Sequence, residues 1–295
     1  MIDRTYLEPT NLEQARSMLG ANQGLRIVAG GTDLVVAARS GKASLPERLI
    51  AIHRLSELAG IHPDHEGRLR IGALTTHGDL EISDAVQASW TALSDASALV
   101  GSPATRHVGT VGGNVCNASP AMELGSPLLV FDAGVELASA GGVRSVQLSS
   151  FVTGPGRTSA RPGEILIAVV LPPLQGPGRA GSAYVRLEYR LAMEIAIVGA
   201  AALVRLDEAD RCVEARVALT AVAPTCIRAP EAEELLRGKT IDSDLLNRAA
   251  GAAAASARPI DDVRASAGYR SAMVPVMVRR ALTMALDRVQ RSRPA

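Results

Sequence analysis

Short apolar runs separated by turn residues divide the first half of the chain into small elements of mixed type. Thr10 or Asn11 is placed to cap a helix, and Gln14 lies where it would complete a capping box. The opening of the chain predicts a β-α-β arrangement. The expected elements are a helix over 12–19, a strand over 25–28, a turn over 29–33, a helix over 34–39, strands over 48–52 and 69–72, and helices over 77–82 and 85–99.

A glycine-rich passage over 101–120 interrupts this pattern. It is so rich in turn residues that no helix is expected within it, and long loops inside compact domains are usually functional. Proline and glycine dominate 172–178, which predicts a boundary between a first domain, residues 1–175, and a second, residues 176–295. Between the passage and the boundary we expect strands over 128–131, 135–137 and 165–171.

The second domain is predicted to combine strands with helices. A last helix over 266–289 has apolar residues at helical spacing, but Pro275 within it should kink the helix or restart it. The other expected elements are three strands, over 183–187, 197–205 and 213–221, and helices over 231–237 and 244–255.

Composition narrows the class of protein. The chain has 295 residues and a formal net charge of +1, which gives no electrostatic case for nucleic-acid binding. Its longest apolar stretch, 195–204, falls well short of the roughly 20 residues of a membrane span. Cys116, Cys212 and Cys226 lie far apart, which argues against a metal site held by this chain alone. We expect a cytoplasmic protein, because an odd number of cysteines without a signal peptide suits a reducing compartment.

The first candidate site is the turn over 29–33 between a predicted strand and a predicted helix. Two glycines let the backbone approach a ligand, and the N–H groups at the start of the helix suit phosphate. Thr32 adds a hydroxyl, whereas Asp33 would repel phosphate and is assigned to the backbone or to a cap. A purely structural turn is the alternative.

The second candidate site is the run Gly109–Asn114. It lacks the Rossmann pattern, since it neither follows a clear strand nor opens a helix, yet it offers unhindered N–H groups, a Thr hydroxyl and an Asn amide. Two such loops suit the two phosphates of one pyrophosphate, and the carboxylate of Glu123 suits ribose hydroxyls. The alternative is two unrelated loops.

Four passages resemble the medium, FAD-binding subunits of the xanthine dehydrogenase and carbon monoxide dehydrogenase family. The resemblance runs in order along nearly the whole chain, and it implies an α+β protein. A vanillyl-alcohol-oxidase-type (PCMH) FAD-binding domain of two subdomains would precede a C-terminal domain with a three-stranded antiparallel sheet and helices. The passages are 27–34, IGALTTHGDL over 71–80, TRHVGTVGGNVCNASPAMELGSPLL over 105–129, and PIDDVRASAGYRSAMVPVMVRR over 259–280.

The resemblance also implies which residues contact FAD. Glu123 stands where the family usually has Asp, Arg186 where many members carry Lys, and Ile195 where some relatives place Tyr. His107 replaces a common Asn, and Cys116 is expected to be a small buried residue beside the flavin site. The implied FAD-binding residues are Ala29, Gly30, Gly31, Thr32, Asp33, Leu34, Thr110, Gly112, Gly113, Asn114, Ser119, Glu123, Ile165, Leu166 and Arg186.

The family implies an oxidoreductase subunit that does not touch the organic substrate. Its FAD receives electrons from the [2Fe–2S] clusters of a small subunit, while a large molybdopterin subunit hydroxylates the substrate, in a dimer of heterotrimers. A self-sufficient FAD-dependent oxidase or monooxygenase on the same scaffold is one alternative. An assembly protein that has lost FAD is another, although the intact glycines of both loops oppose it.

Overall fold

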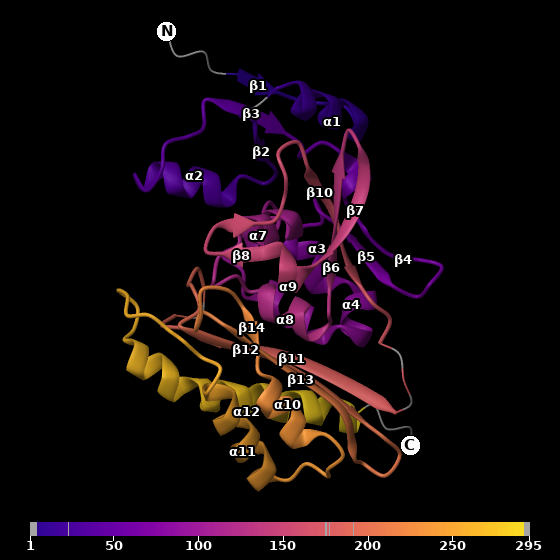
Figure 1. The fold of residues 1–295 in the computed structure, drawn as a ribbon, viewed down its shortest axis with the longest axis vertical. Helices are drawn as coiled ribbons and strands as arrows, with labels where there is room; N and C mark the ends of the chain where they lie inside the picture. Colours follow the sequence, from indigo (N-terminus) through magenta and orange to yellow (C-terminus); the bar gives the residue numbers. More distant parts are fainter. Residues whose placement is uncertain (1–4, 23, 175, 177, 191, 292–295) are drawn as a thin grey trace.

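A computed structural model describes residues 5–22, 24–174, 176, 178–190 and 192–291, and it arranges them in three tiers (Figure 1). A small sheet with two helices lies at one end. A five-stranded sheet with short helices forms the middle, and a four-stranded sheet backed by three helices forms the other end.

The first tier is the predicted β-α-β unit. Its three strands are parallel in the order β1-β3-β2, with Ile27 opposite Ile50. The Asn11 side chain accepts a hydrogen bond from the N–H of Gln14, whose own side chain accepts from the N–H of Thr10, so the predicted cap is confirmed. The elements are β1 (Thr5–Leu7), α1 (Leu12–Ala21), β2 (Arg26–Val28), α2 (Thr32–Arg39) and β3 (Arg48–Ala51).

The second tier is an antiparallel sheet in the order β4-β5-β10-β6-β7. Its central strand β10 is buried along almost its whole length, which explains its continuous apolar sequence. The strands are β4 (Ile61–Pro63), β5 (Leu69–Gly72), β6 (Gly134–Ser139), β7 (Gly142–Gln147) and β10 (Ile165–Leu171); β8 (Val152–Gly154) and β9 (Arg157–Thr158) form a separate pair.

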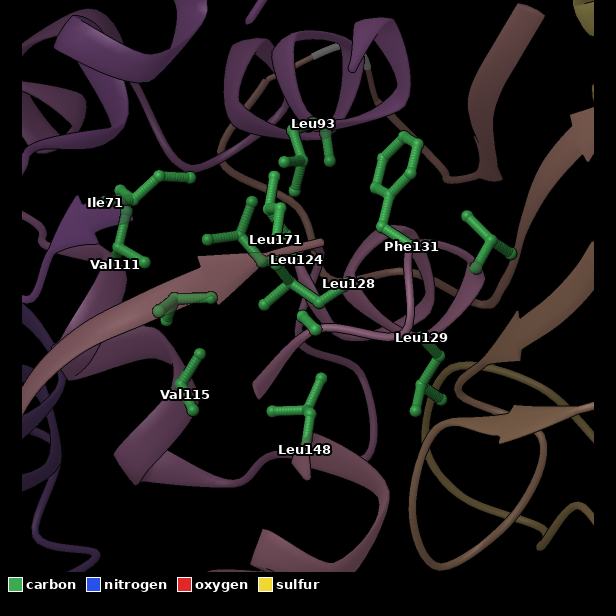
Figure 2. Packing of buried hydrophobic residues seen from close by; sticks show 14 of the residues in the cluster. Ile71, Leu93, Val111, Val115, Leu124, Leu128, Leu129, Phe131, Leu148 and Leu171 are labelled. Carbon is green, nitrogen blue, oxygen red and sulfur yellow. The ribbon is translucent and has the colours of Figure 1, made fainter. Parts of the chain in front are cut away.

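Short helices pack around this sheet and build its core (Figure 2). Figure 2 shows Val111, Val115, Leu128 and Phe131 in one apolar cluster with Leu171 of β10, and all five residues are buried. The helical segments are η1 (Ser56–Leu58), α3 (His77–Ile82), α4 (Asp84–Ser89), α5 (Thr91–Ala98), α6 (Pro103–Arg106), α7 (Val111–Asn117), α8 (Gly125–Val130) and α9 (Leu148–Phe151).

Three predictions for this tier are wrong. The glycine-rich passage contains two helices, α6 and α7, because Thr110 caps α7 and its apolar residues Val111 and Val115 face the core together. The expected strand over 128–131 belongs mostly to helix α8, which is buried on every side and therefore shows no helical periodicity. The single helix expected over 85–99 is two, α4 and α5, which meet at Trp90 in a non-helical conformation.

The third tier contains the three predicted antiparallel strands, and a two-residue fourth strand extends their sheet. The order is β11-β12-β13-β14, and one face is covered by the helices. The last helix runs unbroken through Pro275, so the predicted restart does not occur. The elements are β11 (Arg179–Leu187), β12 (Val198–Leu206), β13 (Cys212–Thr220), β14 (Ile227–Arg228), α10 (Pro230–Leu236), α11 (Ser243–Ala254) and α12 (Ala267–Arg291).

The other face of this sheet packs on the middle tier. Tyr184, Leu203 and Ala218 join the core cluster of the five-stranded sheet, which is why β12 is buried on both faces. At one edge, Arg288 of α12 forms an ion pair of 2.6 Å with Asp95 of α5. Asp95 also accepts a hydrogen bond from the N–H of Tyr184. The two halves of the chain therefore share one interior.

We propose that the two domains divide near residue 175. Strand β10 ends at Leu171 and β11 begins at Arg179, with no helix or strand in the described residues between them. Residues 175 and 177 of the predicted boundary segment lie outside the described part of the chain.

Packing of α12 on β11 yields a test of the fold. A Cβ added at Gly181 would overlap the backbone oxygen of Ala285, so Gly181→Val must push α12 away from the sheet. We expect a loss of about 1–3 kcal/mol in the free energy of unfolding. Gly251, in α11 with open space around it, is the control, and Gly251→Ala should stabilise by ~0.5–1 kcal/mol. Urea unfolding measures both, and unchanged stability in Gly181→Val would contradict the packing.

Candidate functional site

The two glycine-rich loops, more than 70 positions apart in sequence, meet backbone to backbone. Gly30 follows β2, and a Cβ built on it would overlap the carbonyl oxygen of Val108. On the same side, Thr32 Oγ1 lies 3.5 Å from where a Cβ of Gly109 would be. No side chain fits at Gly30 without separating the loops, so the glycine is required for the close approach.

The first loop presents open hydrogen-bond donors. Gly31, in the left-handed conformation with φ of 69°, is the N-cap of α2 and supplies no side-chain cap. The N–H groups of Thr32, Asp33 and Leu34 have no acceptor among the described residues. Such a helix start carries a partial positive charge and suits an anion. The prediction of free donors therefore holds for this loop.

The second loop differs from the prediction, because it opens helix α7 and the N–H groups of Val111, Gly112 and Gly113 are already used. Val111 and Gly112 donate to the backbone oxygens of Thr75 and Ala73, at 2.9 and 2.8 Å. Gly113 donates to Thr110 Oγ1, at 3.1 Å. What this loop leaves for a ligand is an approachable surface at Gly113, where an added Cβ would have only Thr110 Oγ1 within 4 Å.

Asn114 supplies a polar atom to the same region. Its Oδ1 is buried and accepts no hydrogen bond from the described residues. A buried acceptor without a partner is costly unless something else satisfies it. The side chain is therefore suited to bind a donor group of a ligand.

The segment 73–77 is the template that holds the second loop in place. This segment accepts the two hydrogen bonds from α7 described above. It also donates one, from the N–H of His77 to the oxygen of Gly109, at 3.1 Å, and Thr76 pairs with Thr110. Gly112 fits only because it has no side chain, since a Cβ would lie 2.8 Å from Ala73 Cβ. Sequence reasoning treated this segment only as part of a family motif, because its pairing is long-range and leaves no local signal.

His77 follows directly on this contact and is a buried residue of the interior. It is 2% exposed, and burial, reinforced by the positive charge of Arg106, lowers its pKa to about 4. The ring is therefore neutral at neutral pH.

Two exposed residues of the loops, Asp33 and Cys116, have raised pKa values. Asp33 and Cys116 are both reached by solvent, yet the surrounding protein raises the pKa of the Asp33 carboxyl and raises that of the Cys116 thiol to about 12. The prediction that Cys116 is buried is wrong. Its thiol stays protonated at neutral pH, which excludes a nucleophilic thiolate there.

Glu123 and Arg186 form an ion pair across the two halves of the chain. Arg186 Nη1 lies 2.7 Å from Glu123 Oε1, and Arg186 Nε pairs closely with Glu188. Burial and, to a smaller extent, the charge of Asp33 raise the pKa of Glu123 to about 7, against the opposing effect of Arg186. The structure thus brings Glu123, Arg186 and Asp33 into one neighbourhood.

The remaining predicted residues lie at the edges of this neighbourhood. Ala29 and Leu34 are half-buried beside the first loop, and Ser119 accepts from the N–H of Ala121. Ile165 and Leu166 are buried in two separate apolar clusters, which leaves their backbone rather than their side chains for contact with a ligand. 

Neither His107 nor Ile195 belongs to the buried interior, since both are exposed. A cavity of about 350 Å³ lies elsewhere, lined by Asp132, Arg205, Glu214 and Arg216 among others.

Comparison with known proteins identifies both halves of the chain. Residues 2–174 match the family model for the FAD binding domain in molybdopterin dehydrogenase. Residues 182–285 match the CO dehydrogenase flavoprotein C-terminal domain. The chain therefore belongs to the family of FAD-binding proteins of molybdopterin dehydrogenases. The predicted family, its FAD cofactor, its oxidoreductase class and the predicted fold class are confirmed.

Individual relatives are similar along their whole length. The putative xanthine dehydrogenase FAD-binding subunit of Escherichia coli (strain K12) is 33% identical over 282 residues, 96% of each chain. The carbon monoxide dehydrogenase medium chain of Afipia carboxidovorans is 32% identical, with 97% of each chain covered. The solved carbon monoxide dehydrogenase of Hydrogenophaga pseudoflava superposes with a TM-score of 0.90 at 32% identity, over 97% of this chain and 98% of that one.

Two further features bear on the class of protein. None of the helices in the described part of the chain combines the length and the apolar character needed to cross a membrane. Nor do the described residues contain a group of three or more His, Cys, Asp or Glu side chains arranged to hold a metal ion.

The buried His77 predicts a pH dependence of stability. A histidine with a pKa of about 4 when folded and about 6.5 when unfolded binds its proton only in the unfolded chain between these values. The free energy of unfolding should therefore fall as pH drops from about 6.5 to 4, by roughly 3 kcal/mol in total.

Urea unfolding of the apoprotein at pH 7 and pH 5 checks this dependence. His77→Gln should remove the contribution, whereas His65→Gln should leave it intact, because the His65 side chain is 87% exposed. Equal pH dependence in wild type and His77→Gln would contradict the assignment.

Proposed function

We propose that this chain is the FAD-carrying electron-transfer subunit of a molybdenum hydroxylase. In this proposal it takes electrons from the [2Fe–2S] clusters of a small partner subunit, while a large molybdopterin subunit hydroxylates the organic substrate. The observation that carries the proposal is the backbone contact of the two loops, which brings the residues before the open helix start of α2 against the Val108–Gly109 backbone that leads into α7. It fits a pyrophosphate-containing cofactor.

The described residues suit FAD at this site. The N–H groups of Thr32, Asp33 and Leu34 are the donors available to the pyrophosphate, and Asn114 Oδ1 is a buried acceptor that needs a donor. Bound FAD supplies the redox chemistry, and the protein supplies binding, orientation and electrostatics. The glycines keep the approach clear, because a side chain at Gly113 would project into it.

The remaining predicted residues complete the proposed binding surface. Ala29, Ser119 and Glu123 flank the loops, and Ile165 and Leu166 contribute backbone from strand β10. Arg186 belongs to this set through its contact with Glu123.

Whole-length similarity to proteins named as a subunit and as a medium chain supports a role inside a complex. We therefore propose assembly with the two partner subunits as a dimer of heterotrimers, with an external acceptor taking the electrons. The predicted cytoplasmic location is part of this proposal, supported by three unpaired cysteines.

Substitution at Gly113 tests the cofactor site. Gly113→Val should reduce bound FAD to less than about a tenth of the wild-type amount, because its methyl groups occupy the surface that the pyrophosphate approaches. Bound flavin is measured from the absorption spectrum of the purified protein. Gly268→Val, at an open helical position in α12, controls for the effect of valine within a helix and should keep its FAD. Full flavin content in Gly113→Val would show that the pyrophosphate lies elsewhere.

Purification from the native host tests the electron-transfer role. We expect flavin bands together with iron–sulfur absorbance, and two co-purifying subunits. A yellow protein that runs alone would instead favour a self-sufficient flavoenzyme.

A further inference from the structure

Arg186 is the most deeply enclosed charge near the candidate FAD site. Its side chain is 0% exposed, whereas those of its two ion-pair partners, Glu123 and Glu188, are 12% and 13% exposed. The Nη2 atom of Arg186 is buried and has no partner among the described residues. The guanidinium is therefore more deeply buried than the two carboxylates. Within this cluster of Arg186, Glu123 and Glu188, Glu123 belongs to the same half of the chain as the two loops.

The cluster holds fewer positive than negative groups. A guanidinium keeps its single charge throughout the accessible pH range, so Arg186 balances one of two carboxylates. Asp33 of α2 adds a third acidic group whose charge acts on Glu123. Among the described residues, Tyr184 of β11 and Cys226 also interact electrostatically with Glu123. Burial raises the pKa of the Tyr184 phenol well above its usual value and that of the Cys226 thiol to about 12, so both stay neutral.

This imbalance makes Glu123 the group that takes up a proton. Ionised Glu123 would leave a surplus negative charge in a buried place, which is unfavourable. Burial accordingly raises the pKa of Glu123 to about 7, even with Arg186 beside it.

We propose that Arg186 is a positioning residue, which holds the Glu123 carboxyl in the FAD site and divides its one charge between Glu123 and Glu188. The proposal rests on the proposed FAD-binding function. It differs from direct contact between Arg186 and the flavin, because the guanidinium acts on the cofactor site through Glu123.

A pH dependence of FAD binding follows. The pyrophosphate is anionic, so it binds more tightly when Glu123 is protonated, and affinity falls as pH rises through the neutral range. The dissociation constant for FAD should rise roughly tenfold between pH 6 and pH 8.5, which corresponds to a shift of about one pKa unit on binding. Near pH 7.5, binding should draw a substantial fraction of one proton from the buffer.

Glu188 provides the decisive variant, because it shares Arg186 with Glu123 without belonging to the proposed binding surface. In Glu188→Gln, Arg186 has Glu123 as its one carboxylate partner in this cluster. Glu123 then stays ionised across this range, because the charge of Arg186 balances its own. We expect the pH dependence to shrink below about twofold and proton uptake to approach zero. Glu123→Gln should abolish both effects, and Arg186→Lys, which keeps the charge, should preserve them.

The experiment is calorimetric titration of the apoprotein with FAD, at pH 6, 7.5 and 8.5, in buffers of different ionisation enthalpy. Proton uptake is a readout that a merely structural role would not change, and circular dichroism confirms that each variant is folded. If wild type and Glu188→Gln take up the same number of protons, the positioning role is wrong while FAD binding stands. If wild type binds no FAD at pH 6, the proposed function itself fails.

Discussion

The site depends on one contact, the approach of the Gly30 backbone to the backbone of Val108. Each side of this contact is held by its own tier. In the first tier the parallel strands fix where β2 ends, and in the middle tier the segment 73–77 fixes the partner loop through backbone hydrogen bonds. These hydrogen bonds explain why the two loops contribute different groups to the site. Because the first N–H groups of α7 donate to the segment 73–77 and to Thr110 Oγ1, the helix start with open donors is that of α2, and the second loop contributes shape and the Asn114 side chain.

Burial is the second organising constraint, and it acts on charge. Where the two halves of the chain share an interior, a polar residue must find its partner across the junction, as Arg186 finds Glu123 and Arg288 finds Asp95. Where buried negative charges outnumber positive ones, the pKa of a buried carboxyl rises. The cofactor neighbourhood therefore gains its electrostatic character from the C-terminal half, although both glycine-rich loops belong to the other half.

Sequence patterns predicted elements well where a helix has a local cap and where turn residues flank an apolar run. The cap of α1 and the strands of the third tier are examples. Prediction failed at α7 and α8, where glycines sit inside a helix or apolar residues surround it, because local propensity and periodicity cannot reveal tertiary packing. For the site, residue types indicated both loops correctly as neighbours, but the role of Ala73 and Thr75 and the enclosure of Arg186 depend on contacts distant in sequence.

The link between Arg288 and Asp95 has a consequence for synthesis of the chain. Its two residues are 193 positions apart, so a ribosome adding about 5–20 residues per second completes the second roughly 10–40 s after the first. In the first part of that interval, before β11 and β12 have been made, the surface of α5 and α8 that finally meets these strands is uncovered. A nascent chain of this kind exposes apolar surface until β12 is complete, and chaperone occupancy during synthesis should be concentrated on that surface.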